Sequence, residues 1–144
     1  MDKVKVSDKL LLSVEKPARY TGGELNSIVK ETARLRFALC FPDVYEIGMS
    51  HLGSRILYEV INSREEYACE RCFAPWPDME KAMRENNVPM FTLETRTPLA
   101  ECDIVGFSLL YEMCYTNILT MLDLAHIHKR SADRGENEPI IVAG

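Results

Sequence analysis

Strand-like and helix-like patterns alternate along this chain, and that alternation constrains the fold more than any other feature of the sequence. Residues 34–41 (RLRFALCF) have one apolar face and a second face that becomes apolar toward Phe41, which predicts a strand buried on both sides. Residues 49–62 then change to helical spacing. The further elements that we expect are strands at 67–73, 102–110 and 138–144, a short edge strand at 90–93, a helix capped by Asp78, and a helix over 111–127.

Alternating strands and helices indicate right-handed crossovers and a parallel sheet with helices on both faces. We therefore predict an α/β domain over residues 34–144, with a Rossmann-like or flavodoxin-like doubly wound sheet in three α/β/α layers. The strand at 34–41 is expected at the centre of the sheet, and 138–144 is expected to be a buried strand. Residues 1–33 are interrupted by a proline and a glycine pair, so we interpret them as an N-terminal arm.

The helix at 49–62 carries an apolar stripe, which we expect to face the sheet because amphipathic helices bury their apolar side. Ser50 is its expected N-cap. The members of the stripe are Met49, Leu52, Ile56 and Val60, with Leu57 and Ile61 beside them.

Composition and charge narrow the functional classes. With a net charge of −5, the chain lacks the basic balance that nucleic-acid binding needs, so we expect no direct contact with nucleic acid. No apolar run approaches the ~20 residues that span a bilayer, and the N-terminus lacks a signal-peptide pattern. We therefore predict a cytoplasmic protein without membrane contact. Five cysteines, an odd number, argue against a disulfide framework.

The sequence CERC at 69–72 is similar to a metal or redox motif. In a strand, however, residues three apart point to opposite faces, so Cys69 and Cys72 would not share one ion. A second pair of cysteines at the same spacing is also lacking. We therefore expect these cysteines to be structural, and we predict no metal site in the chain.

Ligands of open parallel sheets bind beyond the carboxyl ends of the strands, where the strand order reverses. The loops expected there are PDVYEIGMSHLG (42–53) and SLLYEMCYTN (108–117). Neither loop contains a dinucleotide-binding pattern or a Walker A pattern. Dinucleotides and nucleoside triphosphates are therefore disfavoured as ligands. A phosphorelay receiver is disfavoured too, because Ser108 stands where that domain needs an aspartate.

Three candidates in these loops also have a purely structural interpretation. His51 lies at a predicted helix start, where a hydrogen-bonding surface histidine is the more common case. Tyr111 could pack over the end of the sheet with its hydroxyl in water, and Glu112 could favour a helix N-terminus through the dipole.

Several stretches together resemble the N-terminal domain of a family of radical S-adenosylmethionine (SAM) proteins described as cobalamin-binding. The similarity extends from about Val14 to Gly144 and follows the same order along the chain. The stretches are VEKPARYTGGELNS (14–27), FPDVYEIGMSHLGSRILYEVIN (41–62), ERCFAPWPDME (70–80), FTLETRTPL (91–99) and CDIVGFSLLYEMCYTNILTMLDLA (102–125).

The resemblance implies a Rossmann-like cobalamin domain followed by a C-terminal radical-SAM barrel on the same polypeptide. That barrel would hold a 4Fe–4S cluster and SAM, and the whole protein would be an Fe–S oxidoreductase. No CxxxCxxC motif for such a cluster occurs in the 144 residues, so we expect this chain to be a front domain that is not catalytic alone. The implied cobalamin-binding residues are Tyr45, Glu46 and His51 on one rim and Ser108, Tyr111 and Glu112 on the other.

One departure concerns the cobalt ligand. Many cobalamin domains use D-x-H-x-x-G, but here Met49 and Ser54 stand at the aspartate and glycine positions around His51. Cobalamin would then bind without a protein ligand. Two alternatives stay open: a cofactor-free domain that docks to the barrel and gates its substrate, and an independent flavodoxin-like binder of a small molecule.

Overall fold

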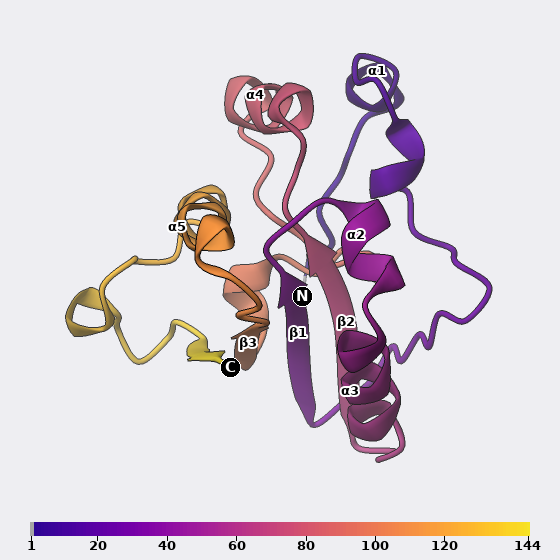
Figure 1. The fold of residues 1–144 in the computed structure, drawn as a ribbon, viewed down its shortest axis with the longest axis vertical. Coiled ribbons are helices and arrows are strands. Elements are labelled where there is room, and N and C mark those ends of the chain that lie inside the picture. Colours follow the sequence, from indigo (N-terminus) through magenta and orange to yellow (C-terminus); the bar gives the residue numbers. More distant parts are fainter. Residues whose placement is uncertain (1) are drawn as a thin grey trace.

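The computed structural model describes residues 2–144 and contains a four-stranded, all-parallel sheet (Figure 1). The strand order is β2-β1-β3-β4, so the first strand lies inside the sheet as the sequence predicts. This confirms the doubly wound α/β fold. The strands are β1 (Leu35–Phe41), β2 (Tyr67–Phe73), β3 (Ile104–Phe107) and β4 (Ile140–Ala143).

Helices cover the two faces of the sheet unequally. On one face, α1, α4 and α5 contribute to the main apolar core, together with Ala38, Cys40 and Val105 of the strands. On the other face, α3 packs through Tyr58 and Ile61 in a smaller cluster. The helices are α1 (Asp8–Leu11), α2 (Tyr45–Ser50), α3 (Leu52–Asn62), α4 (Pro77–Asn86) and α5 (Tyr115–Leu124), and the 3-10 turns are η1 (Pro17–Tyr20), η2 (Leu99–Glu101), η3 (Glu112–Cys114) and η4 (Ser131–Asp133).

The pairing register fixes which side chains share a face. Phe37 pairs with Cys69 of β2 and with Ile104 of β3, so these side chains point to the α3 side. Cys72 points to the opposite side and belongs to the main core. Cys69 and Cys72 therefore lie on opposite faces, as predicted from the CERC motif. All five cysteines are buried and free.

The orientation predicted for the helix at 49–62 is wrong. The segment is two helices that meet at His51, which replaces Ser50 as the N-cap of α3. The residues of α3 that face inward are Ser54, Tyr58 and Asn62. The members of the predicted inner stripe that lie on α3 face outward instead: Leu52 is 65% exposed, Ile56 55% and Val60 60%.

Hydrogen bonds explain why the apolar side of α3 faces outward. Asn62 donates to the Cys69 carbonyl and accepts the Cys69 N–H, both at 3.0 Å, so its amide completes the backbone bonding of β2. The Tyr58 hydroxyl accepts the Ile28 N–H at 2.7 Å, and Arg71 stacks 4.4 Å from the Tyr58 ring centroid. These polar contacts hold one side of α3 against the sheet. The apolar periodicity alone assigns that side to solvent.

Three smaller predictions also fail. Asp78 does not cap α4, because Trp76 is the N-cap and an Asp78 oxygen accepts the Glu15 N–H at 2.7 Å. Residues 90–93 do not form a strand: Phe91 makes only an isolated bridge with Pro98, and the Leu93 N–H bonds the Arg71 carbonyl outside any ladder. The last strand, β4, is largely exposed, with Ile140 64% and Val142 43% accessible.

A buried charge network holds residues 91–97 against the sheet. Glu70, 1% exposed, accepts hydrogen bonds from Arg36 and from Thr92, and from Thr95 at 2.7 Å. Arg36 is itself only 7% exposed. Both charges of this pair are therefore removed from water and depend on each other.

We expect Glu70→Ala to lower the free energy of unfolding by about 3–5 kcal/mol, because it leaves the Arg36 guanidinium buried without a counter-charge. Urea unfolding measures this loss. The matched control is Glu66→Ala, which removes an exposed ion pair with Arg34 (3.6 Å) and should cost under about 1 kcal/mol. Equal losses for the two variants would contradict the role of the network.

Within residues 2–144, none of the helices combines the length and the apolar character that crossing a bilayer requires.

Candidate functional site

The loops that follow β1 and β3 meet at the carboxyl edge of the sheet, because these parallel strands are direct neighbours. The Tyr111 hydroxyl donates to an Asp43 carboxylate oxygen at 2.8 Å. The Asn117 amide, on α5, donates to the Pro42 carbonyl at 2.9 Å. The two predicted rims are therefore joined by hydrogen bonds rather than separated by an open cleft.

Tyr45 and Glu46 turn away from β3 and contact the N-terminal arm. The Tyr45 hydroxyl donates to Glu24 at 3.1 Å, and burial together with this carboxylate raises the pKa of Tyr45. Both carboxylate oxygens of Glu46 accept a hydrogen bond from Arg19 Nε, each at 3.0 Å. A hydrogen bond from its own backbone and the Arg19 charge lower the pKa of Glu46. These two side chains anchor the arm.

His51 is half-buried at the junction of α2 and α3. Its Nδ1 accepts the Ser54 N–H at 3.1 Å and lies 2.8 Å from the Ser54 hydroxyl oxygen. Its ring packs 5.1 Å from the Phe41 ring, centroid to centroid. His51 thus acts as a helix cap, and its Nδ1 is committed to that role.

Ser108, Tyr111 and Glu112 form the β3 side of the edge. Ser108 is buried and continues the strand pairing by donating its N–H to the Cys40 carbonyl at 3.1 Å. Glu112 is exposed at the start of η3. Hydrogen bonds with Cys114 and with Asp43 raise the pKa of Tyr111 well above its usual value. Of the six predicted residues, only Tyr111 reaches across the edge.

An apolar surface surrounds Tyr111 at this edge. We call it the carboxyl-edge surface, and its members are Leu109 (37% exposed), Leu110 (52%), Met113 (81%) and Tyr115 (46%). Four large apolar side chains exposed within seven residues mark a contact site more often than a free surface.

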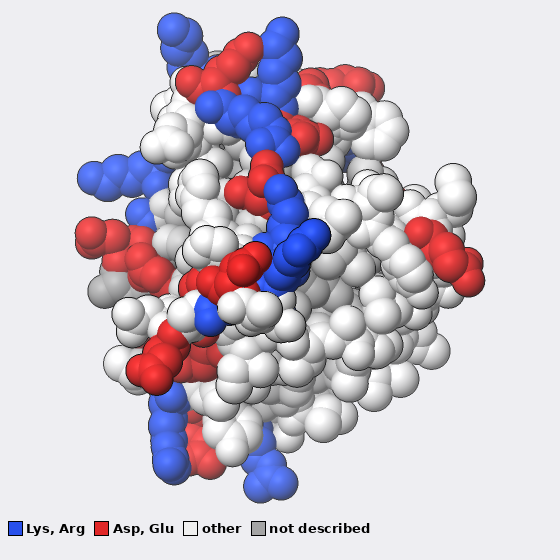
Figure 2. Space-filling model, turned by 90° about the vertical axis from the view of Figure 1, so that its left-hand side faces the viewer, with Lys and Arg blue, Asp and Glu red and all other residues white. Residues whose placement is uncertain are grey.

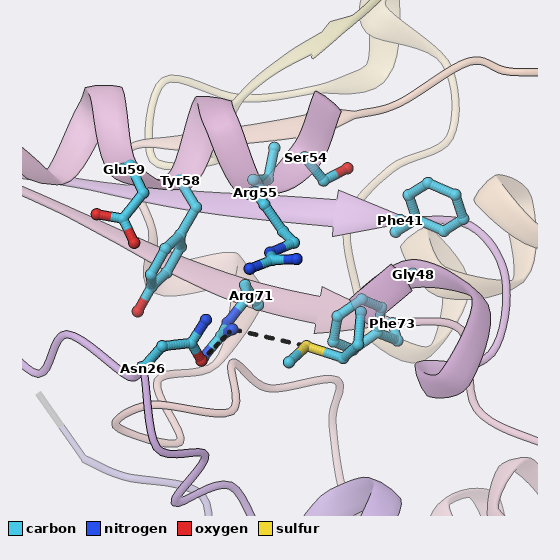
Figure 3. Close-up of a pocket in the computed structure, with 11 residues that line it drawn as sticks. Asn26, Phe41, Gly48, Ser54, Arg55, Tyr58, Glu59, Arg71 and Phe73 are labelled. Atoms are coloured by element: carbon cyan, nitrogen blue, oxygen red, sulfur yellow. Dashed lines mark hydrogen bonds between the residues drawn. The ribbon is translucent and has the colours of Figure 1, made fainter. Parts of the chain in front are cut away.

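A buried arginine lies deeper, between α3, β2 and the arm (Figure 3). Arg71 bonds Glu94 at 2.7 Å and the Ser27 hydroxyl at 3.0 Å, and Asn26 and Tyr58 close around it in the figure. Burial opposes the charge of Arg71, but Glu94 outweighs burial and raises its pKa. Burial raises the pKa of Glu94 as well. Because Arg71 is fully partnered, we assign it a structural role.

The enclosed spaces near the candidate residues are too small for a cofactor. One cavity lies beside Arg71, and a second, lined by Tyr45, Phe73 and Leu93, lies on the other side of Phe73. Each has a volume of about 20 Å³, which is room for about one water molecule. A large ligand therefore does not fit inside either of these two spaces. Among residues 2–144, no cluster of three or more His, Cys, Asp or Glu side chains is arranged to hold a metal.

Asp43 contacts Tyr111 at this edge but is not among the six site residues predicted from the sequence. It follows Pro42 directly at the end of β1, so its position at the carboxyl edge could have been derived from the strand boundary. Its contact with Tyr111 depends on the path of the loop after β3, and no local pattern encodes that path.

Comparison with known proteins supports the class that the fold suggests. Residues 53–144 match the family described as "Radical SAM proteins, N-terminal", and this chain belongs to that family. Membership implies a catalytic domain on the same polypeptide, and in radical SAM proteins that domain holds a 4Fe–4S cluster and SAM. No curated protein and no solved structure matches the chain.

We expect Tyr111 to lose its proton well above pH 10, because the contacts with Cys114 and Asp43 favour the neutral phenol. The stabilising contribution of this raised pKa is complete below pH 10 and is lost as the pH rises through the folded value. The near-ultraviolet absorbance titration, taken as the difference between the wild type and Tyr111→Phe, measures this pKa.

Asp43→Asn should lower the Tyr111 pKa without restoring its usual value, since the Cys114 contact remains. Asp103→Asn is the control, because Asp103 lies at the opposite edge of the sheet and its carboxylate accepts the Arg36 N–H. An unchanged Tyr111 titration in Asp43→Asn would show that the two rims do not touch in solution.

Proposed function

We propose that this chain is the cobalamin-binding-like N-terminal module of a cytoplasmic radical SAM Fe–S oxidoreductase. In this proposal the module supplies a corrinoid to the catalytic domain and turns over no substrate by itself. Family membership supports the radical SAM context. The exposed carboxyl-edge surface is the observation that carries the cofactor assignment, because it lies where open α/β sheets bind their ligands.

The residues at this edge fit a corrinoid bound without a protein ligand to cobalt. A corrinoid is broad and partly apolar, so it suits an exposed apolar surface better than the small cavities below. Leu110, Met113 and Tyr115 would support the ring, while Ser108 and Glu112 would bond the polar groups at its periphery. His51 would not coordinate cobalt through Nδ1, which the cap occupies. A bound corrinoid supplies cobalt-centred radical or group-transfer chemistry.

The test uses the full polypeptide and hydroxocobalamin. We expect the wild type to shift the visible spectrum of the cofactor, and Met113→Asp to weaken binding at least about tenfold, because the ring would desolvate the new charge. Leu12→Asp is the matched control, since Leu12 is equally exposed (80%) but lies far along the chain as the C-cap of α1. An unshifted spectrum of the wild type at high micromolar concentration would refute cobalamin binding.

A cofactor-free docking and substrate-gating domain is the second candidate, and the Trp76 region favours it. The Arg19 guanidinium lies 5.2 Å from the Trp76 ring centroid, and the Tyr20 hydroxyl accepts the backbone N–H of Trp76 at 3.0 Å. This arrangement holds a large aromatic side chain that is still 43% exposed. Exposed tryptophans with fixed orientation are frequent energetic centres of protein contacts.

If Trp76 docks the catalytic domain, Trp76→Ala should raise hydrogen exchange in the contacted part of that domain as well as around α4. Spectral titration with cobalamin should stay unchanged, which separates docking from cofactor binding. Leu25→Ala removes a fully exposed side chain and serves as the control. Exchange that rises only within residues 2–144 would contradict a docking role for Trp76.

A further inference from the structure

The α3 helix carries a row of apolar side chains on the side that points away from the sheet. The row consists of Leu52, Ile56 and Val60, each more than half exposed, and we call it the outer row. The hydrogen bonds of Tyr58 and Asn62 fix the opposite side, so α3 cannot rotate to bury the outer row without breaking them. A contiguous exposed row of this kind marks a contact surface more often than isolated apolar residues do.

The N-terminal arm leaves the outer row free. The Ile28 N–H bonds the Tyr58 hydroxyl, and the Lys30 ammonium bonds the Asn62 carbonyl at 2.8 Å. Tyr58 and Asn62 both belong to the inward side of α3. The arm therefore closes one flank of the helix, and nothing within residues 2–144 covers the outer row.

The spacing of the outer row suits a second copy of the same row. Its members are four residues apart, so the row is symmetric about Ile56. Rows of side chains four apart are the ridges that interdigitate where two helices pack. When two α3 helices meet antiparallel at Ile56, Leu52 of each copy faces Val60 of the other. A two-fold contact of this kind uses one patch on both partners.

Arg55 and Glu59 add charge complementarity beside the outer row. Both are exposed on the flank of α3 that borders the cavity beside Arg71 (Figure 3). Within the described residues neither side chain forms an ion pair, although they lie four residues apart. In the antiparallel arrangement the same flanks of the two copies lie side by side. Arg55 of each copy then approaches Glu59 of the other, so opposite charges meet twice.

Charged side chains on the far side of the molecule are paired within the chain instead. Figure 2, which views the side of α5, shows Lys and Arg interleaved with Asp and Glu. Arg84 bonds Asp123 at 2.8 Å, and Lys129 bonds the same carboxylate at 2.5 Å. These charges are already neutralised, whereas those of Arg55 and Glu59 are available to a second copy.

We propose that α3 is the contact surface of a homodimer, in which two copies of this chain pack their outer rows antiparallel about a two-fold axis at Ile56. The two Arg55–Glu59 contacts lie on one flank of this pair, and Leu57 meets Leu57 on the other. A parallel pair would instead place the charges against Leu57, which costs their hydration. The dimer is independent of cobalamin.

Sedimentation equilibrium of the full polypeptide without cobalamin tests the dimer. One short helix pair is smaller than a standard interface, so we expect a monomer–dimer equilibrium in the range of about 5–200 μM. Ile56→Asp should raise the dissociation constant at least about 20-fold, because the axis brings the two new carboxylates together. Leu12→Asp is the control, since Leu12 is 80% exposed and is the C-cap of α1.

Two outcomes of this measurement overturn the proposal. One is a wild type that stays monomeric over the whole range, which includes the case that another segment of the same polypeptide covers the outer row. The other is a dimer that Ile56→Asp leaves intact, because such a dimer forms through a different surface.

Charge reversal tests the pairing across the axis. Arg55→Glu should raise the dissociation constant about tenfold, since like charges then meet at both symmetric contacts. Adding Glu59→Arg to the same chain should restore the wild-type value. Arg130→Glu makes the same change of net charge at the N-cap of η4 and should have no effect. A double variant that is weaker than Arg55→Glu would contradict the pairing.

Cysteine crosslinking tests the antiparallel direction. Under mild oxidation, Ile56→Cys should form a disulfide with its own copy, because the axis passes through this position. Val60→Cys should not, since about 12 Å along the helix separates it from its own copy. It should link to Leu52→Cys when the two variants are mixed. The native cysteines are buried and contribute little background. Self-linking of Val60→Cys as fast as that of Ile56→Cys would contradict the antiparallel pair.

Discussion

Parallel pairing of β1 with both of its neighbours is the constraint on which the rest of the structure depends. Because β2 and β3 flank β1 in the same direction, every strand ends at one edge, and the loops after β1 and β3 meet there. The same pairing assigns alternate residues to two faces with different neighbours. The carboxyl-edge surface follows from this arrangement.

Two buried ion pairs fix distant segments on this sheet, one on each face. Arg36 and Glu70 lie on the side of the main core, and the threonines around Glu70 attach residues 92–95 there. Arg71 lies on the α3 side, where Glu94 and Ser27 attach the same loop and the arm. Neighbouring residues of one strand therefore organise opposite faces. A buried pair of this kind adds little net stability, but removing one partner leaves the other charge buried and is costly.

The sequence was sufficient for features that depend on local periodicity. One alternating run and several apolar runs predicted the four strands, and the strand period alone placed Cys69 and Cys72 on opposite faces. Local periodicity failed for α3, because hydrogen bonds of Tyr58 and Asn62 outweigh the apolar stripe, and for β4, because no segment within residues 2–144 covers Ile140 and Val142. The Tyr111–Asp43 contact depends on two loop paths, which no local pattern specifies.

Function in this account belongs to the carboxyl edge, and an experimental structure of the full polypeptide with bound hydroxocobalamin tests that claim most directly. We expect the corrinoid to lie over the ends of β1 and β3, in contact with Leu110 and Met113, with His51 still bonded to Ser54. A corrinoid bound elsewhere in the polypeptide, or one coordinated by His51, would contradict the account.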